Sequence, residues 1–236
     1  KERVLYVDSA YYAFNLFNKG FPNAEHNRFA LYLYQLIPWG MFELNMPMSL
    51  TLRVYSLCHI LLHAIAFFLL LKWKQPKLAG LLLIMQIIGY RECFFLTVNE
   101  TALAISATAL LAGLLNLRAD ENRWSMTDNI LSALCILIAL FSHPIAMVLL
   151  PFVIGFHLIR QVKNTTVRKQ SWQLIATLAV MLIIKKLLSN SSGYEDDLYA
   201  QLLQTWHIIT HLKDIYSFKY FTGEFKLQGA FFRIYW

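Results

Sequence analysis

The chain has 236 residues, of which 58% are hydrophobic and only 15% are charged, and its mean hydropathy is +0.47. Soluble domains are about 45–50% apolar and about 25% charged, so this composition argues against a soluble fold. The net charge is +7, but the basic residues concentrate in short loops. This distribution indicates that they set the orientation in the membrane and contact anionic lipid headgroups, rather than binding nucleic acid. We therefore expect an all-α, polytopic membrane protein whose partners include membrane lipids and exclude nucleic acid.

Residues 1–48 form a polar, aromatic-rich segment before the first apolar run. Asp8 heads a Tyr- and Phe-rich stretch that Gly20 closes, which predicts a short acid-capped helix ended by glycine. The stretch 29–44 predicts a second helix along the membrane interface, broken near Pro38. Aromatic side chains prefer the level of the lipid headgroups. A pair of amphipathic helices that lie on the membrane surface and have no catalytic role therefore also explains this segment.

Six apolar runs follow, and most have the 17–25 or so residues that a bilayer-crossing helix needs. The fourth and fifth runs are short and meet at Ser142-His143-Pro144, which predicts either a tight helical hairpin or a re-entrant segment. Proline suits a turn or the first turn of a helix, where its missing N–H costs little. The predicted spans are 50–71, 79–97, 101–117, 129–143, 145–159 and 172–188.

The connecting loops predict the orientation of these spans. Basic residues in alternate loops belong on the cytoplasmic side, which places residues 1–48 and 189–236 outside. Lys185 and Lys186, near the outer end of the last span, argue the other way, and either snorkel to the interface or face a protein interior. The basic loops are 72–78, 118–128 and 160–171, and the nearly neutral turns are 90–100 and 142–145.

Three regions are predicted: an external loop with juxtamembrane helices over 1–48, a transmembrane bundle over 49–188, and an external tail over 189–236. The tail would begin a further loop or helical region. The chain begins at Lys1 without a methionine or signal peptide and stops within an aromatic run. We expect it to be part of a larger polytopic protein, in which an upstream span carries 1–48 across the membrane.

Ionisable residues gather at the predicted external end of the bundle. Charges at membrane depth are expensive and usually face a protein interior or a water-filled cavity. A functional role and a structural ion pair with a neighbouring span are both open for Arg91 and Glu92. The gathered residues are Arg91, Glu92, Glu100 and His143 at span ends, and Asp8, Glu25, His26 and Arg28 before the first span.

Three short motifs resemble the C-type (GT-C superfamily) glycosyltransferases, polytopic enzymes that move sugars from polyprenyl-phosphate carriers to acceptors outside the cytoplasm. Asp8 at the head of a Tyr-rich helix resembles their first external loop. Asn-Glu-Thr-Ala-Leu over 99–103 resembles their acidic outer turn, and Phe-Ser-His-Pro over 141–144 their external His-Pro turn. The resemblance covers most of residues 6–160, but Ser9 stands where many members have the second acid of an Asp-Glu pair.

The resemblance implies transfer of a sugar from a polyprenyl-phosphate lipid to a glycan or protein acceptor at a bacterial inner membrane. Asp8 is then the base that deprotonates the acceptor, although helix capping is the other role open to it. Glu100 and His143 would be further catalytic residues that orient the acceptor or serve as its acid–base partner. A single acid at residue 8 weakens the case for a divalent metal, so no metal ligand is assigned.

The implied substrate-binding residues are Arg28, Arg91, His26 and Glu92. Arginine's planar fork matches phosphate oxygens, and a cation stabilises the phosphate leaving group as the glycosyl bond breaks.

Two other classes of function stay open. One is a polysaccharide polymerase-like or transporter-like protein in which Arg28 and Arg91 bind an anionic glycan or lipid. The other is a non-catalytic membrane subunit of a larger complex. His59 and His63 share a helix face at a spacing that can bind zinc, but hydrogen bonding between helices is the preferred interpretation.

Overall fold

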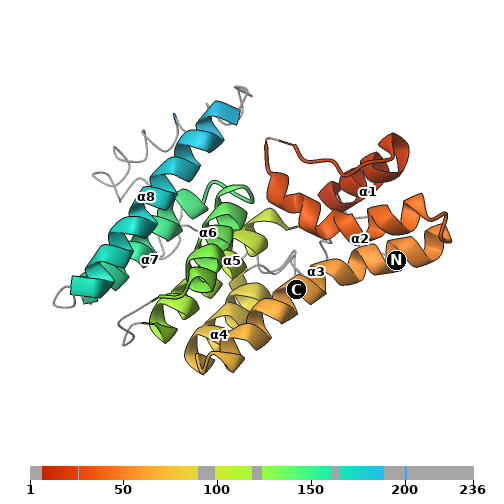
Figure 1. Ribbon diagram of the computed structural model, residues 1–236. Coiled ribbons are helices and arrows are strands. Elements are labelled where there is room, and N and C mark those ends of the chain that lie inside the picture. Colours follow the sequence, from red (N-terminus) through yellow and green to blue (C-terminus); the bar gives the residue numbers. More distant parts are fainter. Residues whose placement is uncertain are drawn as a thin grey trace, which may run out of the picture. The chain divides into compact units, whose positions relative to one another are not determined.

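The computed structural model describes residues 7–25, 27–89, 99–118, 124–160, 165–188 and Ala200. The chain divides into two compact units, residues 1–189 and 190–236, and the helices with defined bounds all belong to the first. Within the described residues the secondary structure consists of helices and turns without strands, which confirms the all-α prediction (Figure 1).

The N-terminal segment forms a helix as predicted. Helix α1 spans Val7–Lys19, and Gly20 follows it with a φ of +71°, a conformation that glycine adopts without steric penalty. The amide of Gly20 still donates to the carbonyl of Leu16, so the glycine closes the last turn. Asp8 lies in the first turn of α1, but its side chain is outside the described part of the structure.

The second predicted helix is present, but the break expected near Pro38 is wrong. A short 3-10 turn, η2 (Phe29–Leu31), leads into α2 (Tyr32–Glu43), which runs through Pro38 as one helix. Side chains on either side of the proline anchor α2 to the preceding loop. Gln35 exchanges two hydrogen bonds with the backbone of Asn23, at 2.7 and 3.0 Å, and the Trp39 indole donates to the carbonyl of Gly20 at 2.9 Å. These tertiary contacts offset the one helical hydrogen bond that proline cannot make.

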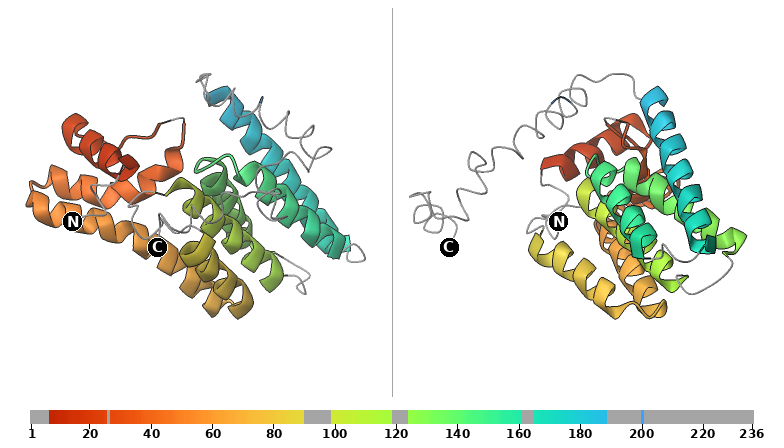
Figure 2. Two further views of the ribbon diagram at one scale, coloured as in Figure 1. Left: turned by 180° about the vertical axis from the view of Figure 1, so that it is seen from behind. Right: turned by 90° about the vertical axis from the view of Figure 1, so that its left-hand side faces the viewer.

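In the part of the chain that the structure describes, six helices follow and run in alternating directions. In α3 and α5, His63 contacts Ser106 and Leu70 faces Gly113, so the two helices run parallel. Helix α4 is antiparallel to both, because its Leu78 faces Gly113 whereas Gln86, just beyond its end, bonds to Ala102. The same alternation continues through α6, α7 and α8 (Figure 2). The bounds are α3 Met48–Lys72, α4 Pro76–Ile84 with a π-helical continuation η3 Met85–Gly89, α5 Glu100–Leu117, α6 Met126–Leu140, α7 Ala146–Arg160 and α8 Thr165–Leu188.

Helix α5 is the centre of this bundle, since it packs against α3, α4, α6 and α7. Its sequence makes that position possible, because small residues let neighbouring backbones approach closely. Five of its small residues are buried, and at one of them, Gly113, an added Cβ would lie 2.4 Å from the Leu70 side chain. The other four are Ala102, Ala104, Ser106 and Ala107.

Among the described residues, three helical segments are long and apolar enough to cross a membrane: α3, α5 and residues Gln170–Leu188 of α8. The other apolar helices are shorter, and a 15-residue helix such as α6 or α7 rises about 22 Å against a hydrocarbon thickness of about 30 Å. The structure therefore supports three membrane-crossing helices and leaves the six-span arrangement as a prediction. The predicted hairpin is confirmed, because residues 141–145 form a tight turn between α6 and α7.

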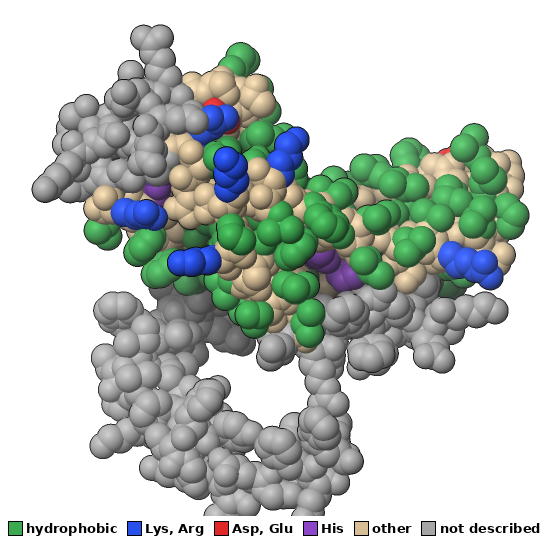
Figure 3. Space-filling view, turned by 90° about the horizontal axis from the view of Figure 1, so that it is seen from below, with side chains coloured by type: hydrophobic (Ala, Val, Ile, Leu, Met, Phe, Trp, Pro, Cys, Tyr) green, Lys and Arg blue, Asp and Glu red, His purple; other side chains and the backbone are tan. Residues whose placement is uncertain are grey.

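Large apolar side chains cover much of the surface, as Figure 3 shows for one face. Along α3, Leu57, Leu61, Ile65 and Phe68 are each more than half exposed, at 51–65%. A continuous exposed apolar stripe of this length suits contact with lipid rather than water.

Candidate functional site at one end of the helix bundle

Five polar side chains meet at the end of the bundle where α5 begins and where α6 and α8 end. Three of them, Arg28, Glu100 and His143, were predicted as site residues, and their meeting agrees with the predicted common side. The other two, Tyr12 and Lys185, were not among the predicted site residues. We call this group the end cluster: Tyr12, Arg28, Glu100, His143 and Lys185.

Four other predicted site residues lie partly or wholly outside the described structure. His26, Arg91 and Glu92 are in segments that the structure does not describe, and only the backbone of Asp8 is described. Their roles stay predictions.

Arg28 and Glu100 form the ionic centre of the end cluster. They make an ion pair in which the side chains are only 10% and 17% exposed. The Tyr12 hydroxyl donates to the other carboxylate oxygen of Glu100, at 3.1 Å. Glu100 opens α5 directly after its N-cap Asn99, whose side chain accepts from the Ala102 amide at 2.9 Å. The positive end of the helix dipole therefore also favours the charged carboxylate.

The guanidinium of Arg28 has one buried edge without a partner. Its Nε–H lies out of contact with solvent and has no hydrogen-bond acceptor among the described residues. Most buried polar groups are hydrogen-bonded, so an unpaired arginine N–H is an open donor position. Glu100 thus holds one side of a buried cation, and the Nε–H on the other side is a donor for a ligand oxygen.

His143 lies in the turn between α6 and α7, where its Nδ1 accepts the backbone N–H of Ile145 at 3.2 Å. Burial, together with the nearby positive charges of Arg28 and Lys185, lowers the pKa of His143 to about 4. The ring is therefore neutral near pH 7. With Nδ1 accepting, its hydrogen is on Nε2, so His143 can offer a hydrogen bond to a ligand oxygen.

The lowered pKa of His143 predicts an acid-sensitive fold. Free histidine has a pKa of about 6.5. Between pH 6.5 and about pH 4, the unfolded chain therefore binds a proton at His143 that the folded chain does not bind. Stability should fall as the pH drops through this window and should level off below it. Thermal unfolding in detergent should show a steeper loss from pH 6.5 to 4 for the natural protein than for His143→Gln. Equal slopes would show that His143 does not carry this effect.

Lys185 joins the cluster from the last turn of α8. It is 3% exposed, and its Nζ donates to the carbonyl of Leu140 at 2.8 Å, at the negative end of α6. Of the two explanations for this lysine, the protein-interior one is therefore confirmed. The signal was present in the sequence, since a charged residue within an apolar span is costly and usually functional. Two cations, Arg28 and Lys185, thus accompany one carboxylate, Glu100.

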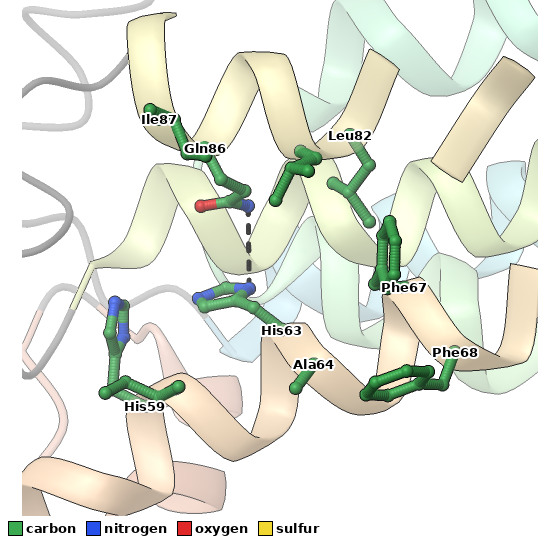
Figure 4. Close-up of a pocket in the computed structure, with 10 residues that line it drawn as sticks. His59, His63, Ala64, Phe67, Phe68, Leu82, Gln86 and Ile87 are labelled. Atoms are coloured by element: carbon green, nitrogen blue, oxygen red, sulfur yellow. Dashed lines mark hydrogen bonds between the residues drawn. The ribbon is translucent and has the colours of Figure 1, made fainter. Parts of the chain in front are cut away.

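A second polar group lies midway along α3, beside an apolar pocket (Figure 4). His63 pairs with Ser106 of α5 at 2.8 Å, with the Tyr34 hydroxyl at 3.3 Å and with the Gln86 amide at 3.5 Å. This confirms the interpretation of His63 as hydrogen-bonded between helices. Among the described residues, no group of three or more His, Cys, Asp or Glu side chains is arranged to hold a metal.

Tyr34 connects the two polar groups. Its hydroxyl contacts His63 and also donates to the carbonyl of Asn99 at 3.3 Å, one residue before Glu100. Polar atoms therefore continue from the middle of α3 to the end cluster. No pattern in the sequence indicates this connection, because Tyr34 is in a helix that is predicted to lie along the interface.

Comparisons with protein-family models, with curated proteins and with solved structures find no match to this chain. The function must therefore be argued from the residues of the end cluster.

Proposed function

We propose that this protein is a membrane glycosyltransferase that takes a sugar from a polyprenyl-phosphate carrier and transfers it to an acceptor at the end cluster. The observation that carries the proposal is Arg28, a buried arginine with an open Nε–H beside a second cation, Lys185, and a neutral histidine donor. Together these groups suit a phosphate that gains negative charge as a glycosyl bond breaks.

The geometry assigns different tasks to the residues first expected to be catalytic. The carboxylate of Glu100 is engaged by Arg28 and Tyr12, so it positions the arginine rather than deprotonating an acceptor. His143 would donate to a phosphate or sugar oxygen through Nε2. The base in this proposal is Asp8, which stands four positions before Tyr12 in the sequence of α1.

In this mechanism the acceptor hydroxyl loses its proton to Asp8 and attacks the anomeric carbon of the sugar. The bond between that carbon and the phosphate oxygen breaks, and its electron pair leaves with the polyprenyl phosphate. Arg28 and Lys185 stabilise the negative charge on the departing phosphate. One displacement of this kind inverts the configuration at the sugar.

Asp8→Asn tests the proposed base. We expect the variant to fold and insert normally, and to lose glycosyl transfer by at least about 100-fold, since positioned general bases contribute about 10²–10⁴-fold. The assay uses membranes containing the full chain and a panel of radiolabelled polyprenyl-phosphate sugars, with release of the labelled sugar from the lipid as the readout. Glu43→Gln, an acid at the end of α2, is the matched control and should retain activity. Undiminished transfer by Asp8→Asn would remove Asp8 from the mechanism.

The polar connection through Tyr34 favours one second candidate, a transporter-like protein for an anionic glycan or lipid. Polar residues at membrane depth often mark a substrate path, and His63 and Ser106 contact Gln86 in the π-helical segment that continues α4. A transporter would lose substrate movement when His63 becomes leucine. The proposed enzyme would keep its transfer activity in the same variant, because His63 does not belong to the end cluster.

A further inference from the structure

Two pockets line the same face of α3. The larger, with a volume of about 800 Å³, lies between α1 and the first turns of α3. The smaller, of about 280 Å³, lies further along α3 beside His63, opposite α4 and η3 (Figure 4). Neither contains a residue of the end cluster.

The spacing of the lining residues shows that the pockets share a helix face. The larger pocket takes Ser49, Leu52, Arg53, Ser56 and Leu57 from α3. The residues seven positions after Leu52, Arg53, Ser56 and Leu57 are His59, Ile60, His63 and Ala64, and all four line the smaller pocket. Seven residues are almost two helical turns, so these side chains follow one another along a single stripe.

The larger pocket has one charged residue and an apolar opposite wall. Arg53 is exposed in the second turn of α3, and no carboxylate among the described residues pairs with it. Ser49 and Ser56 stand three or four residues to either side of it and add hydroxyl donors on the same face. The facing wall comes from α1, whose Phe14 is 66% exposed. The remaining α1 residues of this wall are Ala10, Ala13 and Phe17.

The smaller pocket is almost wholly apolar, and it lies at a depth that fits a chain end. Ten residues separate Arg53 from His63, which is a rise of about 15 Å along α3. This is half the thickness of a hydrocarbon layer of about 30 Å, so a lipid with its phosphate at Arg53 would end near His63. Phe67, Phe68, Leu82 and Ile87 would surround that end.

We propose that the face of α3 from Ser49 to Phe68 binds one anionic glycerophospholipid of the bilayer, with its phosphate on Arg53 and an acyl chain reaching the pocket beside His63. An anionic lipid fits better than a zwitterionic one, because a quaternary ammonium group gains nothing from an arginine, whereas each basic residue near the surface attracts anionic lipid. The site is separate from the end cluster and does not depend on the glycosyltransferase proposal.

Photo-crosslinking in nanodiscs tests the site. The full chain carries a photoactivatable phenylalanine analogue in place of Leu57 and is reconstituted with phosphatidylcholine containing a minor fraction of phosphatidylglycerol. We expect phosphatidylglycerol adducts to exceed their share of the lipid at least fivefold. Arg53→Gln should lower this enrichment about fivefold, the effect of one basic residue near an anionic surface, while Arg53→Lys should largely retain it.

Two matched controls separate the site from general attraction to the membrane. Lys72→Gln removes a cation from the opposite end of α3 and should leave the adduct unchanged. Ser56→Phe should fill the larger pocket and lower the adduct, whereas Leu61→Phe, outside both pockets, should not. Elution volume and thermal unfolding confirm that each variant is folded.

Equal labelling by both phospholipids, or an unchanged adduct in Arg53→Gln, would overturn the proposal. Addition of undecaprenyl phosphate tests whether the phosphate on Arg53 belongs to a bilayer phospholipid or to a polyprenyl carrier. Retention of the phosphatidylglycerol adduct at equimolar undecaprenyl phosphate supports a resident phospholipid. Complete displacement would assign the face to the polyprenyl carrier and would overturn it.

Discussion

Arg28→Gln is expected to abolish binding of polyprenyl phosphate and to lower the free energy of unfolding by about 3 kcal/mol. The stability loss follows from the surroundings of Glu100, which would keep a largely buried carboxylate without its cation. The loss of binding follows from removal of the open Nε–H donor and of one of the two cations in the end cluster. Binding is measured with radiolabelled undecaprenyl phosphate in nanodiscs, and stability by unfolding in detergent.

A double variant separates the two effects. Arg28→Gln combined with Glu100→Gln removes both charges, so most of the lost stability should return while binding stays absent. A structural ion pair with no ligand role would give the opposite result, with binding restored along with stability. Natural levels of binding in the folded double variant would therefore contradict the proposed phosphate site.

Arg118→Gln is the matched control, because Arg118 pairs with Asp128 at 3.2 Å at the opposite end of the bundle. Asp128 also accepts hydrogen bonds from the backbone and hydroxyl of Ser125, so its carboxylate keeps partners when the arginine is removed. We expect a smaller loss than for Arg28→Gln, because Arg118 is 28% exposed and Asp128 keeps its hydrogen bonds from Ser125, and we expect unchanged lipid binding.

Gly113→Leu is expected to give the second large effect, the separation of α5 from α3. A Cβ at this position would lie 2.4 Å from Leu70 and 3.4 Å from Trp73. Leu70 is fully buried, so it cannot move into solvent to make room. Overpacking of a core typically costs about 1–3 kcal/mol, and a whole leucine side chain should reach or exceed the upper value. Thermal unfolding and the yield of monodisperse protein are the measurements.

Gly155→Leu provides the control for helix propensity and size, since no atom lies within 4 Å of the corresponding Cβ in α7. It should leave stability unchanged or raise it slightly, because leucine is a better helix former than glycine. Leu70→Ala should partly rescue Gly113→Leu by vacating the contested space. A fully stable Gly113→Leu protein would show that α3 and α5 do not pack through this glycine.

The sequence determined those features that depend on local periodicity and composition. The apolar runs predicted α3, α5 and α8 closely, because a long apolar helix satisfies its own backbone hydrogen bonds and needs no partner to define it. Gly20 predicted the end of α1, because glycine adopts the positive φ at a helix end without steric penalty, and that preference is local too. The alternating basic loops also placed Arg28, Glu100 and His143 at a common end, where Arg28 pairs with Glu100 and bears on the charge state of His143.

Local patterns were insufficient where distant contacts outweigh a residue's own preference. Pro38 should interrupt α2, but Gln35 and Trp39 anchor the helix on both sides of it. The sequence leaves both an interfacial and an interior position open for Lys185, and the end of α6, which offers the Leu140 carbonyl, decides between them.

Only the tertiary structure decided which polar atoms meet. It joined Arg28 to Glu100 across 72 residues and left one guanidinium edge open, and it aligned two pockets on one face of α3. Periodicity specifies which face of a helix is apolar, whereas the pairing of charges depends on how separate helices pack, and that packing is a property of the whole bundle.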